Sequence, residues 1–270
     1  MPTRDEAWPT GTPNWVDLSA DDSTAAARFY SELFGWRVDP PAEDAGGYAI
    51  ATKDDRPVAG IGPKPVPEMP SNWATYIATD DADATARAVT DAGGSLHMEP
   101  FDVETAMGKH GRMFFGTATD GSTFGVWEAG NHIGAGVYNE PGALAWNELH
   151  SRDLDSGRAF YAEVFGYEFD DMSSDDFTYL VFKRPGEDDG VGGMGTAAML
   201  PEGVPSVWLA WFAVDSCDAT VAKVQELGGS VRAELGDSPF GRMAVVEGAQ
   251  GEVFGVIGLS EAQEEASTTD

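Results

Sequence analysis

Residues 14–36 read NWVDLSADDSTAAARFYSELFGW, and residues 145–167 read AWNELHSRDLDSGRAFYAEVFGY. Eight of these 23 positions are identical at an offset of 131 residues. A second pair follows in each half, WATYIATDDADATARAVTDAGGS from Trp73 and WLAWFAVDSCDATVAKVQELGGS from Trp208. Repeats at a fixed period indicate duplicated structural units. We therefore expect the 270 residues to form two related domains, residues 1–138 and 139–270.

Each half divides again into two similar units. Apolar and polar residues alternate over residues 15–19, as in a half-buried strand, and residues 23–34 place apolar side chains at helical spacing. Asp22 precedes this helix as a candidate N-cap, and Gly35 is placed to end it. Residues 73–79 and 83–92 repeat the strand and helix, and three short strands follow. The sequence thus predicts an α+β protein of four βαβββ units.

The charge of the chain limits its partners. It carries 46 acidic and 16 basic residues, a net charge of −30, which disfavours nucleic acid and anionic membrane surfaces. No apolar run reaches the ~20 residues of a membrane span, and no secretory signal is visible at the start. The single cysteine, Cys217, excludes an intramolecular disulfide. We expect a cytoplasmic monomer or homodimer whose partner is a small molecule.

Several motifs carry a family resemblance. The F-Y-x-x-x-F-G pattern after each first helix and the G-x-x-F-G-V pattern at the last strand of each half, on four βαβββ units, resemble the vicinal oxygen chelate superfamily. G-R-M also recurs, at residues 111–113 and 241–243. That group includes glyoxalase I, bleomycin-resistance proteins and extradiol dioxygenases. The tandem arrangement, with W-x-x-L or W-N-E-L opening each half and P-V-A-G-I-G near Pro57, is similar to a bacterial subgroup described as glyoxalase-like hydroxylases. The resemblance implies that pairs of units curl into cupped mixed sheets around a cavity.

The same resemblance gives a negative prediction for metal. Metal enzymes of the superfamily place His, Gln or Glu on inward positions of particular strands. The matching positions here carry side chains that cannot ligate a cation: Trp15, Ala74 and Gly125 in the first half, and Trp146, Leu209 and Gly255 in the second. We therefore predict no metal and no cofactor.

Strand alternation then identifies the inward-facing residues. We expect Glu148 and His150 to be catalytic, since a carboxylate and an imidazole on one face can move a proton. Arg112 and Arg242 recur in the G-R-M motifs and are candidate counter-ions for Asp17 and Glu148. His110 ends a five-residue excess in the first half, expected to form a lid-like loop over residues 99–110. The predicted ligand-binding residues are Trp15, Asp17, Tyr76, Trp127, Trp146, Trp211 and His110.

Each of these candidate catalytic and binding residues also has a purely structural interpretation. The two tryptophans at 15 and 146 can be core plugs, the two acids can be hydrogen-bonded within the fold, and the histidines can be ordinary strand-end or loop residues. The favoured function is a metal-free cup that binds a small, mostly apolar or aromatic molecule, with or without metal-independent acid–base catalysis. The alternatives are a metal-dependent lyase of the glyoxalase I type, an oxygenase or hydroxylase, and a protein-interaction module.

Overall fold

A computed structural model describes residues 2–41, 44–175 and 177–259. Each half of the chain builds one sheet, the first of nine strands and the second of eight. The strand orders are β2-β3-β4-β1-β5-β9-β8-β6, with β7 also paired to β8, and β11-β12-β13-β10-β14-β17-β16-β15. The first half contains β1 (Pro13–Ala20), α1 (Ser23–Phe34), β2 (Arg37–Val38), β3 (Ala49–Lys53), β4 (Arg56–Pro63), β5 (Asn72–Thr79), α2 (Ala82–Asp91), β6 (Ser95–Leu96), β7 (Phe101–Thr105), β8 (Gly108–Thr117) and β9 (Thr123–Ala129). The second contains β10 (Leu144–Ser151), α3 (Leu154–Phe165), β11 (Glu168–Asp171), β12 (Tyr179–Lys183), β13 (Gly190–Thr196), a short 3₁₀ turn (Ala197–Met199), β14 (Val207–Val214), α4 (Cys217–Glu226), β15 (Ser230–Ser238), β16 (Gly241–Glu247) and β17 (Val253–Leu259).

The helices begin and end where local chemistry directs. The Asp22 carboxylate accepts a hydrogen bond from the Ala25 N–H, which fixes the start of α1, and Gly35 ends it in the left-handed conformation at φ 72°. Asp153 and Gly166 do the same for α3, so the duplication extends to the caps. The predicted helix over 23–34 is confirmed. The second-quarter helix begins one residue earlier than predicted because the Asp81 side chain caps it.

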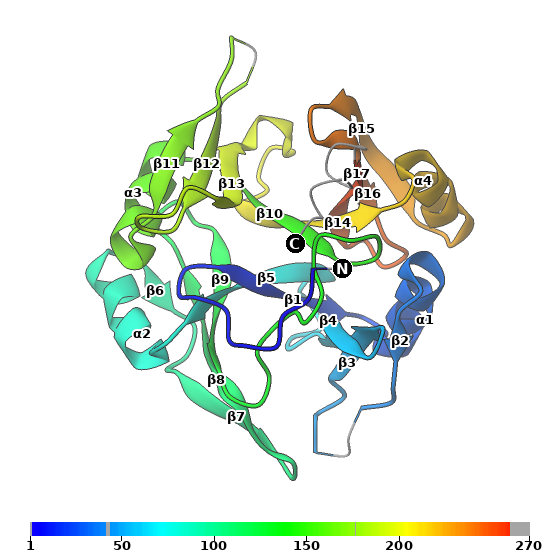
Figure 1. Cartoon of the computed structure of the whole chain (residues 1–270), viewed down its shortest axis with the longest axis horizontal. Coiled ribbons are helices and arrows are strands. Elements are labelled where there is room, and N and C mark those ends of the chain that lie inside the picture. Colours follow the sequence, from blue (N-terminus) through cyan, green and yellow to red (C-terminus); the bar gives the residue numbers. More distant parts are fainter. Residues whose placement is uncertain (1, 42–43, 176, 260–270) are drawn as a thin grey trace.

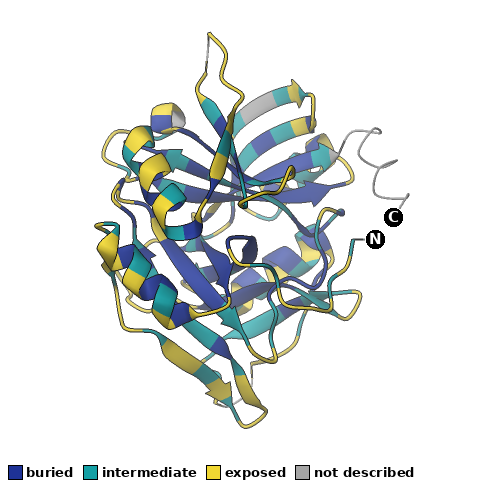
Figure 2. Cartoon of the chain, turned by 60° about the vertical axis from the view of Figure 1, so that its left-hand side comes forward, coloured by how far each residue is buried: buried dark blue, intermediate teal, exposed yellow. Residues whose placement is uncertain are grey.

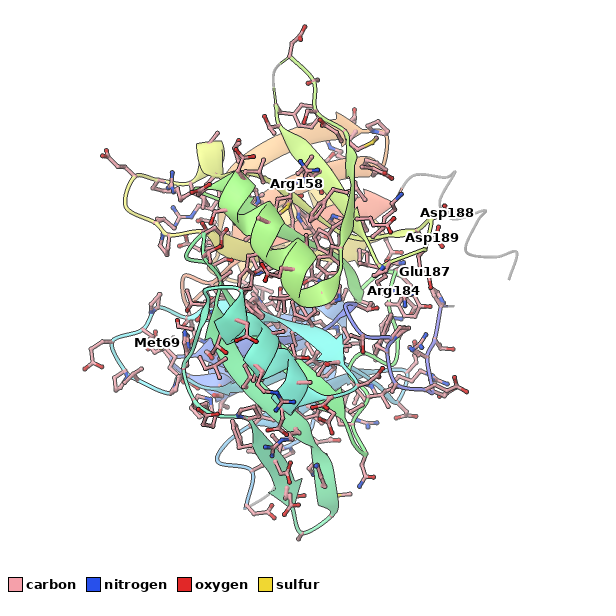
Figure 3. The ribbon with its side chains drawn as sticks, turned by 90° about the vertical axis from the view of Figure 1, so that its left-hand side faces the viewer. Met69, Arg158, Arg184, Glu187, Asp188 and Asp189 are labelled. Carbon is pink, nitrogen blue, oxygen red and sulfur yellow. The ribbon has the colours of Figure 1, made fainter. Side chains whose placement is uncertain are left out.

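The two sheets pack back to back, and their concave faces point away from each other (Figure 1). Helices α1 and α4 flank one side of the contact and α2 and α3 the other; Figure 3 shows α3, which carries Arg158, beside α2. Each side has an apolar core drawn from both sheets, such as Val16 with Phe212 and Ile77 with Leu149. Burial is therefore greatest in the central strands, where dark blue dominates Figure 2. The α+β architecture of four units is confirmed.

Buried polar bonds hold the two halves together at equivalent places. The Tyr30 hydroxyl donates to Glu252 Oε1 at 2.9 Å and accepts from Trp73 Nε1 at 3.1 Å. On the opposite side Tyr161 accepts from Trp208 Nε1 and pairs with the Ser122 hydroxyl at 2.9 Å. Burial raises the pKa of the Glu252 carboxyl. The Tyr30–Glu252 and Tyr161–Ser122 bonds join the first half to the second, so they specify how the two sheets face each other.

The predicted loop over residues 99–110 is instead a hairpin. Strands β7 and β8 pair through most of this segment, with Val103 opposite Gly111, so the five extra residues lengthen a hairpin. His110 lies on β8, and its Nε2 hydrogen-bonds with Thr105 Oγ1 at 2.7 Å. The expectation of an irregular lid was wrong because paired strands satisfy backbone groups that a loop would leave to water. No helix in the described ranges is long and apolar enough to cross a membrane.

Candidate functional site

The predicted inward residues gather on the two concave faces, which we call the first and second cups. Trp15, Tyr76 and Trp127 form one apolar cluster in the first cup. Leu209, Trp211 and Ile257 form another in the second, with Trp146 packed against them. Register places Trp15 opposite Tyr76 and Trp146 opposite Trp211. The strand phase predicted from the sequence is the phase found in the structure.

The first cup contains a closed network around Asp17. Asp17 Oδ1 accepts from Trp15 Nε1 and from the Tyr48 hydroxyl, each at 2.6 Å. Tyr76 supplies a further hydrogen bond to the same carboxyl. Burial nevertheless raises the pKa of Asp17 above its ordinary value, since desolvation outweighs the three donors. Trp15, Tyr48 and Tyr76 therefore all direct their donors to Asp17.

The residues that follow β9, among them His132 and Ala135, cover the first cup. His132 meets Trp15 edge to face at 4.4 Å between ring centroids, and its carbonyl accepts from Trp127 Nε1. Ala135 joins the same cluster, and its carbonyl accepts from Trp8 Nε1 at 3.0 Å. Burial lowers the pKa of His132 to about 4. Trp15 is consequently only 2% exposed, so the structure packs it as core.

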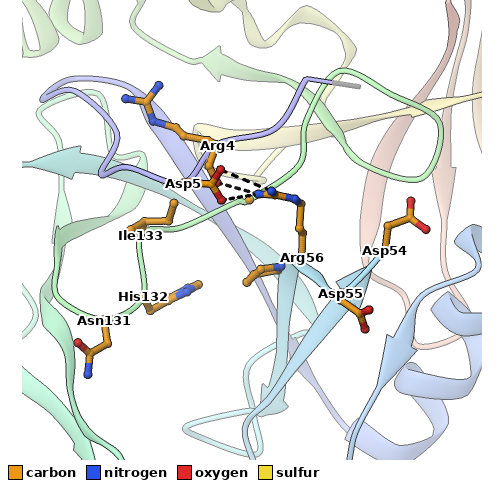
Figure 4. Close-up of a pocket in the computed structure, with 10 residues that line it drawn as sticks. Arg4, Asp5, Asp54, Asp55, Arg56, Asn131, His132 and Ile133 are labelled. Atoms are coloured by element: carbon orange, nitrogen blue, oxygen red, sulfur yellow. Dashed lines mark hydrogen bonds and ion pairs between the residues drawn. The ribbon is translucent and has the colours of Figure 1, made fainter.

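A hollow of about 530 Å³ lies beside this covered cup, lined by His132 and by charged residues (Figure 4). Its charges are already paired: Arg56 binds Asp5 at 2.8 Å, and Arg4 donates to the backbone carbonyls of Glu6 and Ala7. The charged side chains of the hollow are thus engaged, and His132 Nε2 is a buried polar atom of its lining that has no hydrogen-bond partner among the described residues. His110, on the neighbouring hairpin, belongs to this half of the molecule and does not join Glu148 and His150.

The second cup holds the same chain of groups with an additional histidine. Trp146 Nε1 donates to the Tyr179 hydroxyl at 3.0 Å, and Tyr179 donates to Glu148 Oε2 at 3.1 Å. Burial and the neighbouring Glu148 raise the pKa of Tyr179, which keeps it protonated as a donor. His150 Nε2 lies 2.9 Å from Glu148 Oε1, within hydrogen-bond reach but without the alignment of a good bond. Both side chains are 15% exposed.

The second cup differs most at Trp211. Its counterpart Tyr76 bonds to the acid of the first cup, whereas Trp211 Nε1 is buried with no hydrogen-bond partner among the described residues. A buried donor without an acceptor costs about 1–3 kcal/mol. Among the described residues, the first cup thus leaves the His132 Nε2 without a partner, whereas the second leaves the Trp211 Nε1 donor without one beside a carboxylate–imidazole pair.

The predicted arginine counter-ions lie elsewhere. Arg112 binds Asp83 and Asp102, and Arg242 binds Asp218 and Asp237, so each arginine ties the start of a helix to a hairpin. That expectation was wrong because both arginines lie on the far side of their strands. The acids obtain donors from aromatic side chains instead.

Tyr48 and Tyr179 were missed by the sequence reasoning. They occupy equivalent positions at the same offset of 131 residues, so extending the repeat comparison would have found them. Glycines make room for them: a Cβ at Gly60 would overlap Tyr48 and Asp17, and one at Gly193 would overlap Tyr179.

The residues at the metal-ligand positions do not fit a metal. A side chain at Gly125 or Gly255 would collide with the ring of Tyr76 or Trp211, whose atoms lie within 3.0 Å of the Cβ that such a side chain needs. The indoles of Trp15 and Trp146 have no lone pair to offer. Within the described ranges, no group of three His, Cys, Asp or Glu residues is placed to hold an ion.

Comparison with known proteins gives two family matches. Residues 15–120 match the description "Glyoxalase-like domain", and residues 143–256 match "Glyoxalase/Bleomycin resistance protein/Dioxygenase superfamily". The Mycobacterium tuberculosis protein named "Putative glyoxylase CFP32" is 44% identical over 95% of this chain and 98% of its own length. The "Anthracycline biosynthesis protein DnrV" of Streptomyces peucetius is 35% identical over 93% of this chain and 94% of its own.

Solved structures share the fold at low sequence identity. The Mn(II)-bound glyoxalase of Novosphingobium aromaticivorans gives a TM-score of 0.64 at 18% identity, covering 93% of this chain and 84% of that one. The 2,2',3-trihydroxybiphenyl 1,2-dioxygenase of Sphingomonas wittichii gives 0.60 at 16% identity, covering 92% and 90%. The two family matches and the full-length relatives agree with the duplicated cups described above. The chain belongs to the glyoxalase/bleomycin resistance protein/dioxygenase superfamily, with one such domain in each half.

Proposed function

We propose that the second cup binds a small planar aromatic molecule carrying a hydrogen-bond acceptor, and that Glu148 and His150 exchange a proton with it. The observation that carries this proposal is the partnerless Trp211 Nε1. A ligand carbonyl or phenolic oxygen that accepts from it relieves the cost of the buried donor. Flat rings suit the aromatic walls, because Trp146, Tyr179 and Trp211 present faces and edges rather than charges.

The paired acid and imidazole support the proton step. Glu148 Oε1 and His150 Nε2 are 2.9 Å apart; each side chain is 15% exposed, and the Nε2 atom itself is buried. A carboxylate takes a proton from an acidic C–H or O–H of the ligand, and the adjacent imidazole carries it onward. Tyr179 holds the other carboxylate oxygen, so the acid keeps one orientation. In the first cup a serine, Ser19, occupies the position of His150, so that cup lacks the pair.

The names of two relatives agree with a fused-ring aromatic ligand. DnrV and the DauV protein of Streptomyces sp. strain C5, 36% identical over 93% of this chain, are both named as anthracycline biosynthesis proteins. Anthracyclines are built on planar fused rings bearing carbonyl and phenolic oxygens.

Calorimetric titration with ortho-hydroxyacetophenone tests the binding. Trp211→Phe removes the donor but keeps an aromatic ring, and we expect about a fivefold to tenfold loss of affinity. Trp127→Phe is the matched control, since it makes the same change in the first cup, and its affinity should equal that of the wild type. Equal losses in both variants, or no loss in either, would refute the assignment to the second cup.

Deuterium exchange into the acetyl group of the same ketone, followed by NMR in D₂O, tests the proton step. We expect the wild type to accelerate exchange and Glu148→Gln to abolish the acceleration with binding retained. Asp17→Asn, the equivalent change in the first cup, should leave the rate unchanged. Exchange by Glu148→Gln at the wild-type rate would refute the role of this carboxylate.

A further inference from the structure

The hairpin that joins β11 to β12 projects beyond the second cup (Figure 1). Its pairing continues past the ends of the two strands: the Met172 N–H donates to the Tyr179 carbonyl, and the Ser174 N–H donates to the Phe177 carbonyl, both at 2.9 Å. The register therefore sets Met172 opposite Tyr179 and Ser174 opposite Phe177.

This register fixes which way the hairpin side chains point. Residues directly opposite each other in an antiparallel pair share a face, as do residues two apart along one strand. Because Tyr179 points into the cup, Met172 and Phe177 lie on the same concave side. The Phe177 and Tyr179 ring centroids are 6.4 Å apart. The aromatic lining thus runs outward from Trp146 through Tyr179 to Phe177.

Met172 and Phe177 remain largely open to solvent, at 53% and 54% exposed. The fold does not require large apolar side chains there. At the offset of 131 residues, the equivalent positions of the first half carry Pro41 and Gly46. Exposed apolar side chains that continue the wall of a binding site are typical of contacts to a ligand.

We infer that Met172 and Phe177 bind the outer rings of a planar ligand of about three fused rings, whose inner ring reaches Trp211 and Glu148. This inference rests on the proposed function and extends it to the length of the ligand. The second cup then discriminates ligands by size: a single ring is held by the inner residues alone, and each further ring contacts the hairpin.

Two probes with the same hydroxy-ketone group separate these contributions. We titrate ortho-hydroxyacetophenone, with one ring, and 1-hydroxyanthraquinone, with three, into the wild type and into Phe177→Ser. The substitution is expected to weaken binding of the three-ring probe about threefold to tenfold and to leave the one-ring probe unchanged. Phe101→Ser is the matched control, since it removes an exposed phenylalanine from the first half, and it should change neither affinity.

Other results would overturn either the inference alone or the proposed function together with it. Wild-type binding of the three-ring probe that survives Phe177→Ser undiminished, or equal weakening for both probes, overturns the inference and leaves the proposed function standing. Absence of wild-type binding to both probes overturns the proposed function and the inference with it. Sedimentation showing a wild-type dimer that Phe177→Ser dissociates also overturns the inference, because the hairpin then contacts a second copy.

Discussion

Replacing Gly255 with alanine tests whether the Trp211 ring really fills the place of a metal ligand on the last strand. Three ring atoms of Trp211 are the nearest neighbours of the added Cβ, and even Cε2 would lie only 2.7 Å away, where ordinary contacts begin at 3.4 Å. The ring has to move within a packed cluster, and such overpacking costs about 1–3 kcal/mol. Without the clash, alanine would stabilise this strand position by about 0.4–1 kcal/mol, because it restricts the unfolded chain.

Whether Gly255→Ala lowers or raises the free energy of unfolding therefore shows whether the Trp211 ring occupies this position. Urea denaturation should show Gly255→Ala less stable than the wild type. In a Trp211→Leu background, where the ring is absent, the same alanine should cost nothing or stabilise, so the two substitutions should be coupled. If Gly255→Ala costs the same in both backgrounds, or stabilises the wild type, the ring does not occupy this position.

Three further changes test the polar networks. Tyr179→Phe should cost about 1–3 kcal/mol in urea denaturation, because Trp146 Nε1 then has no acceptor; Tyr48→Phe should cost less, because Trp15 Nε1 keeps Asp17. Asp17→Asn should gain stability relative to the wild type as the pH rises from 3.8 toward neutrality, because a raised folded pKa gives the wild type stability at low pH that is lost as the pH rises above this ordinary value. Tyr30→Phe should cost about 1–3 kcal/mol, because it leaves buried Glu252 and Trp73 without their partner.

Three other results would contradict these expectations. Equal losses for Tyr179→Phe and Tyr48→Phe would mean that the two cups share one network. An Asp17→Asn advantage that does not grow as the pH rises from 3.8 toward neutrality would mean that burial does not raise this pKa. A Tyr30→Phe protein as stable as the wild type would mean that the bond between the halves contributes nothing.

The fold could be predicted from the sequence because the duplication repeats local signals. The apolar spacing and the Asp22 and Gly35 caps define α1, and Asp153 and Gly166 repeat them in α3. Alternation with period two then gives the strand phase, and one slip would have reversed every side chain. The hairpin of β7 and β8 was missed because its polar, glycine-containing sequence resembles a loop, and its pairing depends on neighbouring strands.

The site was only partly predictable for a different reason. Glu148, His150 and Trp211 follow from strand phase, but hydrogen-bond partners depend on which strands become neighbours. Tyr179 reaches Glu148 from β12 across a glycine of β13, a relation that no local pattern carries. The covering of the first cup by His132 was equally invisible, because this histidine has no counterpart in the repeat.

The indole N–H signals of ¹⁵N-tryptophan-labelled protein test the central claim most directly. On addition of ortho-hydroxyacetophenone, we expect the Trp211 signal to move downfield as its donor gains an acceptor, with a smaller change at Trp146. The Trp15 and Trp127 signals should stay in place, because their donors are already bonded in the covered cup. Movement of Trp15 and Trp127 with Trp211 unchanged would place the ligand in the first cup and contradict the account.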